Sequence, residues 1–249
     1  PLRTWASGWV ASVDERNGLP TLMRGGSPAV TTTFSFFGRS WDWTYLQTEF
    51  KTNGPYRYTL AGKNTALDFD LNAQIQKQDP QSLTWKFALD ARSMKSDLSG
   101  GGIVFNFDPS LFAGEMGPPT LLPDNRGWSW GNAQGRRIEM RFEPALAGVY
   151  FEPGDKSEVR AFFYKNTIKP GRQEFTATLS VSGDVAIGPT SSERFGLTDP
   201  KSWPTDKLDW KTSPVDLSFL NAEEKPAGKR GFVKASGEQL LFADNTPAR

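Results

Sequence analysis

The sequence predicts an all-β protein, namely an antiparallel β-sandwich of jelly-roll type with a proline-rich C-terminal connector. Aromatic residues make up 13% of the 249 residues, with 9 Trp and 18 Phe, and such side chains favour strands. Turn-forming residues are frequent, with 24 Gly and 18 Pro. Short runs of alternating apolar and polar residues recur between these turns, and no segment shows the apolar period of a helix of three turns.

Two neighbouring segments alternate most clearly. Residues 67–75 and 83–89 each place apolar residues at every second position, and Asp79-Pro80-Gln81-Ser82 supplies the turn, so a hairpin is predicted. By contrast, the first thirty residues are expected to form an irregular lead-in with one edge strand. The glycines at 100–102 are expected to allow a bulge or a tight bend. Further strands are expected at residues 33–37, 41–50, 56–60, 103–107, 138–142, 159–164 and 175–181.

Composition divides the chain into three parts. Residues 1–188 hold the predicted sandwich, which we expect to be a carbohydrate-binding domain. Residues 189–227 are rich in Pro, Ser, Asp and Lys and are expected to form an ordered connector. Residues 228–249 are expected to form a hairpin, with a turn at Ser236-Gly237.

Charge and residue usage exclude several classes of function. The chain has 29 basic and 28 acidic residues, so we expect neither a nucleic-acid nor a membrane partner. It contains no Cys, which rules out disulfides, thiolate zinc sites and Cys nucleophiles. It contains no His either, which rules out Ser-His-Asp triads, histidine-ligated metals and a His general base. Hydrolytic chemistry would then need carboxylates, Lys, Tyr or a hard metal ion.

Two pairs of tryptophans are the candidate binding residues. Each pair has i, i+2 spacing, which puts both indoles on one face of a strand, and small or polar residues surround them. Flat aromatics in a polar frame suit the apolar face of a sugar ring, while polar side chains at the rim bond its hydroxyls. The alternative is that these rings belong to the core, since Trp is highly buried on average. The predicted platform is Trp41, Trp43, Tyr45, Trp128 and Trp130, and the predicted hydrogen-bonding residues are Asp42, Asn125, Arg126 and Asn132.

The second pair is the stronger candidate of the two. Trp128 and Trp130 follow a long Gly- and Pro-rich loop at residues 108–127, and loops of this length often carry function. Trp41 and Trp43 follow the apolar stretch 34–37, which favours burial for them.

The last nineteen residues resemble a known family. Gly231-Phe232-Val233 is followed by Gly237-(x2)-Leu240-(x)-Phe242 and then by Asp244-Asn245-Thr246-Pro247-Ala248-Arg249. This is similar to the G-x-x-L-x-F-x-D-G-x-P-x-R hairpin that precedes the first strand in many (β/α)8-barrel glycoside hydrolases. Asn245 replaces the usual Gly, and Asn also accepts left-handed backbone conformations.

The resemblance implies that residues 1–249 form the N-terminal, carbohydrate-binding-module-like part of a modular glycoside hydrolase. The implied partners are a polysaccharide or oligosaccharide and a C-terminal catalytic domain of the same chain. Because polymeric glycans lie outside the cell, a secreted or periplasmic location is expected. The expected function is non-catalytic glycan binding that keeps the attached hydrolase at its substrate.

Two alternatives stay open. The sandwich could brace the barrel without binding sugar, or it could be a self-contained glycanase or lyase that uses carboxylates. For the latter, Glu139 and Glu143 flank Arg141, but surface charge explains them better. No cofactor is expected, although sandwiches of this kind often hold a structural calcium ion. Oxygen donors of the right type are Asp68, Asp70, Asn72, Asp97 and Asp108.

Overall fold

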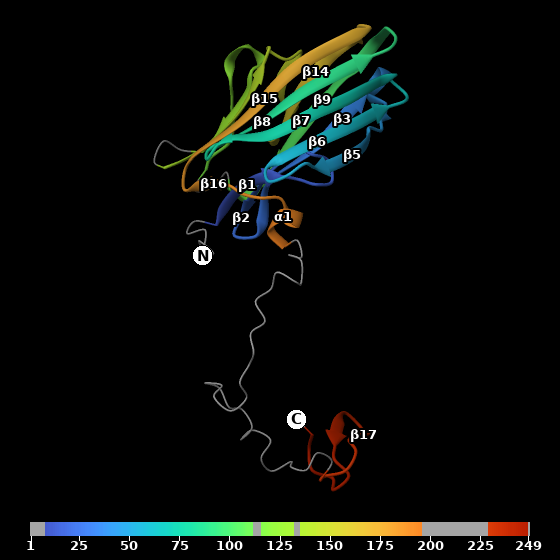
Figure 1. The fold of residues 1–249 in the computed structure, drawn as a ribbon, viewed down its shortest axis with the longest axis vertical. Coiled ribbons are helices and arrows are strands. Elements are labelled where there is room, and N and C mark those ends of the chain that lie inside the picture. Colours follow the sequence, from blue (N-terminus) through green and yellow to red (C-terminus); the bar gives the residue numbers. More distant parts are fainter. Residues whose placement is uncertain (1–7, 112–115, 132–134, 196–228, 249) are drawn as a thin grey trace. The chain divides into compact units, whose positions relative to one another are not determined.

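The computed structural model describes residues 8–111, 116–131, 135–195 and 229–248, and the sandwich in it confirms the predicted all-β fold (Figure 1). Contacts divide the chain into two units, Pro1–Gly196 and Leu197–Arg249. Within the described residues the single α-helix is α1 (Ser191–Phe195). Most of the expected connector at 189–227 lies outside the described residues.

The first sheet has eight strands, and all but one of its pairings are antiparallel. Strand β1 pairs in parallel with β16, and the short β4 is attached only to β3. In spatial order the sheet contains β13 (Gly148–Glu152), β14 (Asp155–Ile168), β9 (Lys95–Phe107), β3 (Ser27–Phe37), β2 (Pro20–Arg24), β1 (Trp9–Val13) and β16 (Val185–Ile187), with β4 (Trp43–Thr44) beside β3.

The second sheet also has eight strands and is antiparallel throughout. Its order is β10 (Thr120–Leu121), β11 (Gly127–Trp130), β12 (Arg136–Glu143), β15 (Gly171–Gly183), β8 (Ser82–Ala91), β7 (Phe69–Asp79), β6 (Arg57–Asn64) and β5 (Gln47–Thr52). The hairpin that alternation predicted is the β7–β8 pair. The long loop at 108–127 contains β10 and two 3-10 turns, η2 (Pro109–Leu111) and η3 (Pro123–Asn125).

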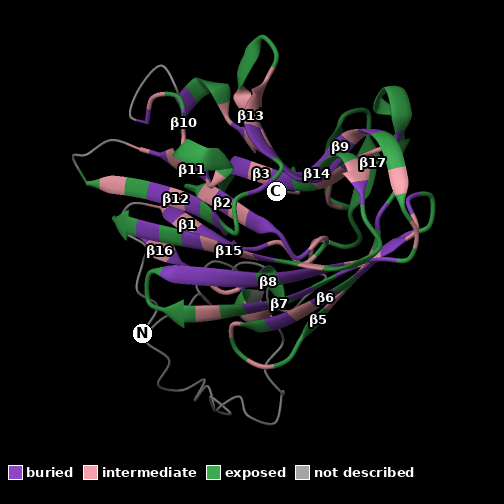
Figure 2. Cartoon of the chain, turned by 90° about the horizontal axis from the view of Figure 1, so that it is seen from above, coloured by how far each residue is buried: buried purple, intermediate pink, exposed green. Residues whose placement is uncertain are grey.

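The core lies between the two sheets, because each strand turns alternate residues inward. In β7 the side chains of Phe69, Leu71 and Ile75 are buried, whereas Asn72 and Gln74 face outward. Figure 2 shows the same alternation as changes between buried and exposed colour along the strands. The outward faces of both sheets are therefore the surfaces on which a site can be built.

The prediction of an irregular lead-in is wrong. Residues 9–37 instead supply β1, β2 and β3, and β1 carries the buried Trp9. The turn formers that indicated irregular chain are the turns between these strands. Gly25 and Gly26, with φ of 54° and 88°, connect β2 to β3.

The prediction of a single strand at residues 41–50 is also wrong. A 3-10 turn, η1 (Arg39–Trp41), comes first, and the chain then passes through β4 in one sheet to β5 in the other. Ser40 and Trp41 have φ of 52° and 64°, which no regular strand can contain. This break places the first tryptophan pair on a bend.

The second unit contains a small hairpin of β17 (Lys234–Ser236) and β18 (Gln239–Leu241), with Gly237 in the turn. After it the chain folds back, since the Phe242 N–H donates to the Thr246 carbonyl at 2.8 Å. Asn245 has φ of 65°, the left-handed conformation for which Asn can replace Gly. Phe232 is 95% exposed within this unit.

Candidate functional site

Trp128 and Trp130 lie in the core, which corrects the expectation that they form a sugar platform. Their exposed fractions are 2% and 1%. The spacing does place both indoles on one face of β11, but that face is the inner one. Both rings make edge contacts with Phe107 of the opposite sheet, with centroid distances of 4.9 and 5.1 Å. Their faces are therefore closed to a ligand, and the small polar Ser129 between them faces outward.

The polar residues predicted beside this pair build the local chain. The Asn125 side-chain oxygen accepts the Val149 N–H at 3.1 Å and so ties η3 to β13. Arg126 forms an ion pair with Glu143 at 3.7 Å. Asn132 lies outside the described residues. This end of the sandwich does not bring the predicted binding residues together around an open ring.

The first tryptophan pair has the opposite environment. Trp41, Trp43 and Tyr45 are 50%, 59% and 65% exposed, and they are the exposed large aromatic residues of the sandwich within the part of the chain that the structure describes. Trp43 is the cross-strand partner of Phe37, which puts the two side chains on the outward face of the first sheet. We call Phe37, Trp41, Trp43 and Tyr45 the aromatic surface, and the buried Phe162 ring lies against Trp41 beneath it.

Backbone hydrogen bonds hold Trp41 in an unusual conformation. A left-handed φ is strained for a bulky side chain, and two such residues follow one another here. The Trp41 N–H donates to Ser99 Oγ at 2.8 Å, and the Asp42 N–H donates to the Arg39 carbonyl at 2.9 Å. An ion pair of 3.0 Å joins Arg39 to Asp97 on β9. The bend is thus tied to β9, and the backbone that carries the indole is held in place.

The rings of the aromatic surface contact one another at varied angles. Trp41 meets Phe37 edge-on at 5.2 Å and Phe162 at 6.5 Å. The guanidinium of Arg160 lies 5.5 Å from the Trp41 ring centroid, within cation–π range. Trp43 and Tyr45 form a tilted pair at 5.8 Å. Asp42, predicted as a hydroxyl partner, lies between the two tryptophans and is exposed.

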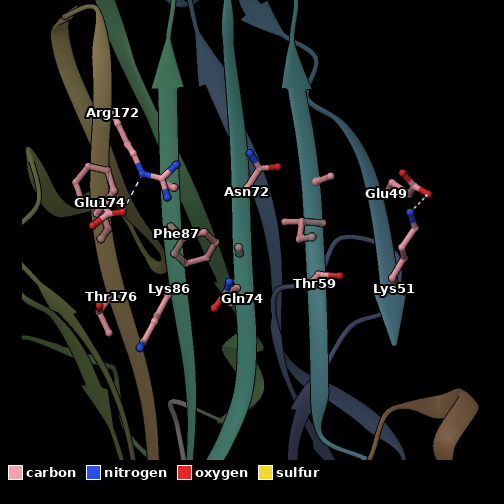
Figure 3. A pocket seen from close by; sticks show the side chains of 15 residues that line it. Glu49, Lys51, Thr59, Asn72, Gln74, Lys86, Phe87, Arg172, Glu174 and Thr176 are labelled. Carbon is pink, nitrogen blue, oxygen red and sulfur yellow. Dashed lines mark hydrogen bonds and ion pairs between the residues drawn. The ribbon is translucent and has the colours of Figure 1, made fainter. Parts of the chain in front are cut away.

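A second feature, which the sequence did not reveal, is a groove of about 540 Å³ on the outward face of the second sheet (Figure 3). Its sides are two ion pairs, Lys51–Glu49 on β5 and Arg172–Glu174 on β15, each 2.9 Å long. Ala88 on its floor is only 6% exposed although it faces outward. The side chains on the floor are Thr59, Ala61, Asn72, Gln74, Lys86, Ala88 and Thr176. Alternation in the sequence identifies which residues of each strand face outward. The order of the strands in the sheet is what brings these residues together in one groove.

The carboxylates considered for catalysis are held by arginines. Glu139 accepts hydrogen bonds from Arg137 at 2.8 Å and from Arg141 at 3.0 Å. Burial opposes ionisation of Glu139, but these two arginines outweigh it, so its pKa is lowered. A general acid needs a raised pKa, and Glu139 has the reverse. Glu143 pairs with Arg126 instead.

The oxygen donors considered for calcium form ion pairs and hydrogen bonds with other residues. Arg92 forms ion pairs with both Asp68 and Asp70. Asp97 pairs with Arg39, and Asp108 accepts the Ser110 N–H at 2.9 Å. Among the described residues no three acidic side chains come together to hold a metal ion. A calcium site therefore stays a prediction without a structural location.

No protein-family model matches the chain, and no curated protein matches its sequence. In the described ranges, no helix has the length and apolar character needed to span a membrane. The outward faces of the two sheets are therefore the features that bear on function.

Proposed function

We propose that the sandwich binds carbohydrate without catalysing a reaction, and that the aromatic surface is its binding site. The observation that supports this most is the exposure of Trp41, Trp43 and Tyr45 within five consecutive residues. A stable fold gains by burying such rings, at roughly 25 cal/mol per Å² of apolar surface. Exposed aromatics gathered on one face mark an interaction site.

A sugar ring fits this surface chemically. Its C–H face docks on an indole or phenol ring, and its hydroxyls reach polar groups at the rim. Asp42 and Arg39 are exposed beside the rings and supply an acceptor and a donor. By analogy with stacked bases, each ring contributes about 1–3 kcal/mol. Because Trp41 is held in place by its backbone, little entropy is lost when the ligand binds.

The wider proposal is that this binding serves an attached glycoside hydrolase. It rests on the resemblance of residues 231–249 to the hairpin that precedes the catalytic barrel. The exposed Phe232 and Leu240 of the hairpin, 95% and 57% exposed, are apolar groups that such a barrel would cover. A polymeric glycan ligand also implies a secreted or periplasmic protein.

Affinity electrophoresis in gels that contain soluble glycans tests the binding site. Trp41→Ala and Trp43→Ala should each weaken retardation roughly tenfold, at about 1.4 kcal/mol per factor of ten. Both side chains are exposed, so circular dichroism should report an intact fold. Met94→Ala is the matched control, because Met94 is 65% exposed and lies outside the aromatic surface.

Two results would contradict the proposal. One is an unmodified protein that no glycan on a broad panel retards. The other is equal retardation of the unmodified protein and both tryptophan variants. Either result would favour the bracing role, with the aromatic surface packed against a neighbouring domain.

A further inference from the structure

The floor of the groove on the second sheet carries a continuous row of polar side chains. Strand register places Thr59 opposite Gln74, Gln74 opposite Lys86, and Lys86 opposite Thr176. Directly opposed residues project from the same face, one strand spacing of about 4.8 Å apart. Figure 3 shows these four side chains in order across the strands. The spacing is close to the length of one sugar residue in an extended chain.

The cations of the groove differ in their partners. Lys51 is paired with Glu49, and Arg172 is paired with both Glu174 and Asp90. Lys86, in the middle of the floor, has no carboxylate partner among the residues that the structure describes. Its ammonium group is a compact point charge with three donors. It is therefore the cation of this groove that a ligand can use without breaking an ion pair.

The neighbours of Lys86 can bond sugar hydroxyls. The side chains of Asn72, Gln74 and Thr176 line the groove, and none of them hydrogen-bonds another described residue. Amide and hydroxyl groups both donate and accept, as hydroxyl recognition needs. The groove also lacks an open aromatic platform, since its lining rings Phe87 and Phe175 are 2% and 7% exposed. Affinity here must come from charge and hydrogen bonds.

We infer that this groove binds an extended glycan chain that carries anionic substituents, and that Lys86 recognises the anion. The shared chemistry is a carboxylate or a sulfate ester on a hydroxyl-rich chain. The site lies on the outward face of the second sheet, whereas the aromatic surface lies on that of the first sheet. The inference therefore does not rest on glycan binding at the aromatic surface.

Titration calorimetry on the 249-residue chain tests it with four polymers at low ionic strength. Polygalacturonate carries carboxylates and dextran sulfate carries sulfate esters. Methyl-esterified polygalacturonate and dextran are the neutral counterparts with the same backbones. We expect binding of at least one polyanion, weaker binding of its neutral counterpart, and an affinity that falls as salt is added. The polyanion that binds identifies the substituent.

Variants then locate the site. Lys86→Gln should weaken polyanion binding about tenfold, because one charge-assisted hydrogen bond is lost. Lys156→Gln removes the same charge from an exposed position of β14 and should leave binding unchanged. Ala61→Leu keeps every charge and adds no aromatic platform, but fills the floor from an exposed position, and should also weaken binding. Circular dichroism checks that each variant is folded.

Several results would overturn the inference. These are the absence of polyanion binding, equal losses in Lys86→Gln and Lys156→Gln, or unchanged binding in Ala61→Leu. Equally tight binding of single-stranded DNA would show that charge alone is recognised, which also contradicts a glycan site. Trp41→Ala should leave polyanion binding intact, so a failure at either surface can be told from a failure at the other.

Discussion

Trp128 combines a tightly packed ring with a polar atom that lacks an acceptor. Its ring contacts Phe105 at 5.1 Å and Phe107 at 4.9 Å, while its buried Nε1 has no hydrogen-bond partner in the described structure. Trp128→Ala should therefore lower the free energy of unfolding by about 3–5 kcal/mol. Trp128→Phe should cost less, because it also removes an unsatisfied donor worth about 1–3 kcal/mol. Urea unfolding followed by circular dichroism measures both.

The aromatic surface supplies the comparison for this prediction. Trp43→Ala removes an exposed ring and should change the unfolding free energy by less than about 0.5 kcal/mol. If Trp128→Ala shifted the urea midpoint no more than Trp43→Ala, the assignment of Trp128 to the core would be wrong.

These tryptophans show what single residues reveal about a site. The i, i+2 spacing correctly put Trp128 and Trp130 on one face of a strand. It could not say which face, because the rings that cover them, such as Phe107, are distant in sequence. Trp41 was predicted as a platform residue, although the apolar strand before it favoured burial. Its left-handed φ, stabilised by Ser99 from β9, turns it outward, and that contact is also long-range.

At the scale of elements, β9 depends on its glycines. Gly102 lies against β14, where an added Cβ would overlap the Ala161 carbonyl oxygen. At Gly100, where φ is 135°, a side chain would overlap the buried Phe162 ring beneath the aromatic surface. The predicted bulge is present, since the β14–β9 register shifts after Phe162. The glycines thus let a neighbouring strand and an aromatic ring come close to β9.

Gly102→Ala tests this close approach. The added methyl group should push β14 away from β9 and lower the unfolding free energy by about 1–3 kcal/mol, the usual cost of overpacking. Thermal unfolding measures the loss. Gly148→Ala is the matched control, because a Cβ there meets only the Tyr150 ring at 3.4 Å. Equal melting temperatures for the two variants would show that β9 and β14 can separate without cost.

Elements differ in how far their own sequence defines them. The β7–β8 hairpin was predictable because alternation and turn residues agree within one short segment. The order of strands was not, because β9 pairs with β3 and β14 across long stretches of chain. The groove exists only through that order. Thr176 reaches the floor because β15 pairs with β8, about ninety residues earlier in the chain, as the register of Thr176 with Lys86 records.

At the scale of the whole sandwich, Glu193 joins its last described segment to the second sheet. Its carboxylate accepts the Tyr58 hydroxyl at 2.5 Å, the Tyr56 N–H at 2.9 Å and the Thr190 N–H at 2.9 Å. Burial opposes ionisation of Glu193, but these donors outweigh it and lower its pKa. Burial, together with the hydrogen bond to Glu193, raises the pKa of Tyr58. The ionised carboxylate is thus the form that links the last described segment of the sandwich to the second sheet.

Because the pKa of Glu193 is lowered, the link that its carboxylate forms is sensitive to acid. The folded state binds the Glu193 proton less tightly than the unfolded chain, whose ordinary value is 4.5. Its contribution to stability is therefore fully present above that value and is lost as pH falls through the lower folded-state pKa. Glu193→Gln should reduce the unfolding free energy by about 1–3 kcal/mol at neutral pH, since fewer acceptors remain. The same variant should also lose less stability on acidification.

Urea unfolding at a series of pH values, from neutral to well below the ordinary glutamate pKa, separates this effect from general acid lability. Glu143→Gln is the control, because the Glu143 side chain is 68% exposed and, among the residues that the structure describes, a single ion pair of 3.7 Å involves it. Its stability should follow the unmodified protein across the whole series. The curves for Glu193→Gln and the unmodified protein should converge at the acid end, where Glu193 is protonated in both the folded and the unfolded states. Parallel curves would mean that the charge of the Glu193 carboxylate contributes nothing to the stability of the sandwich.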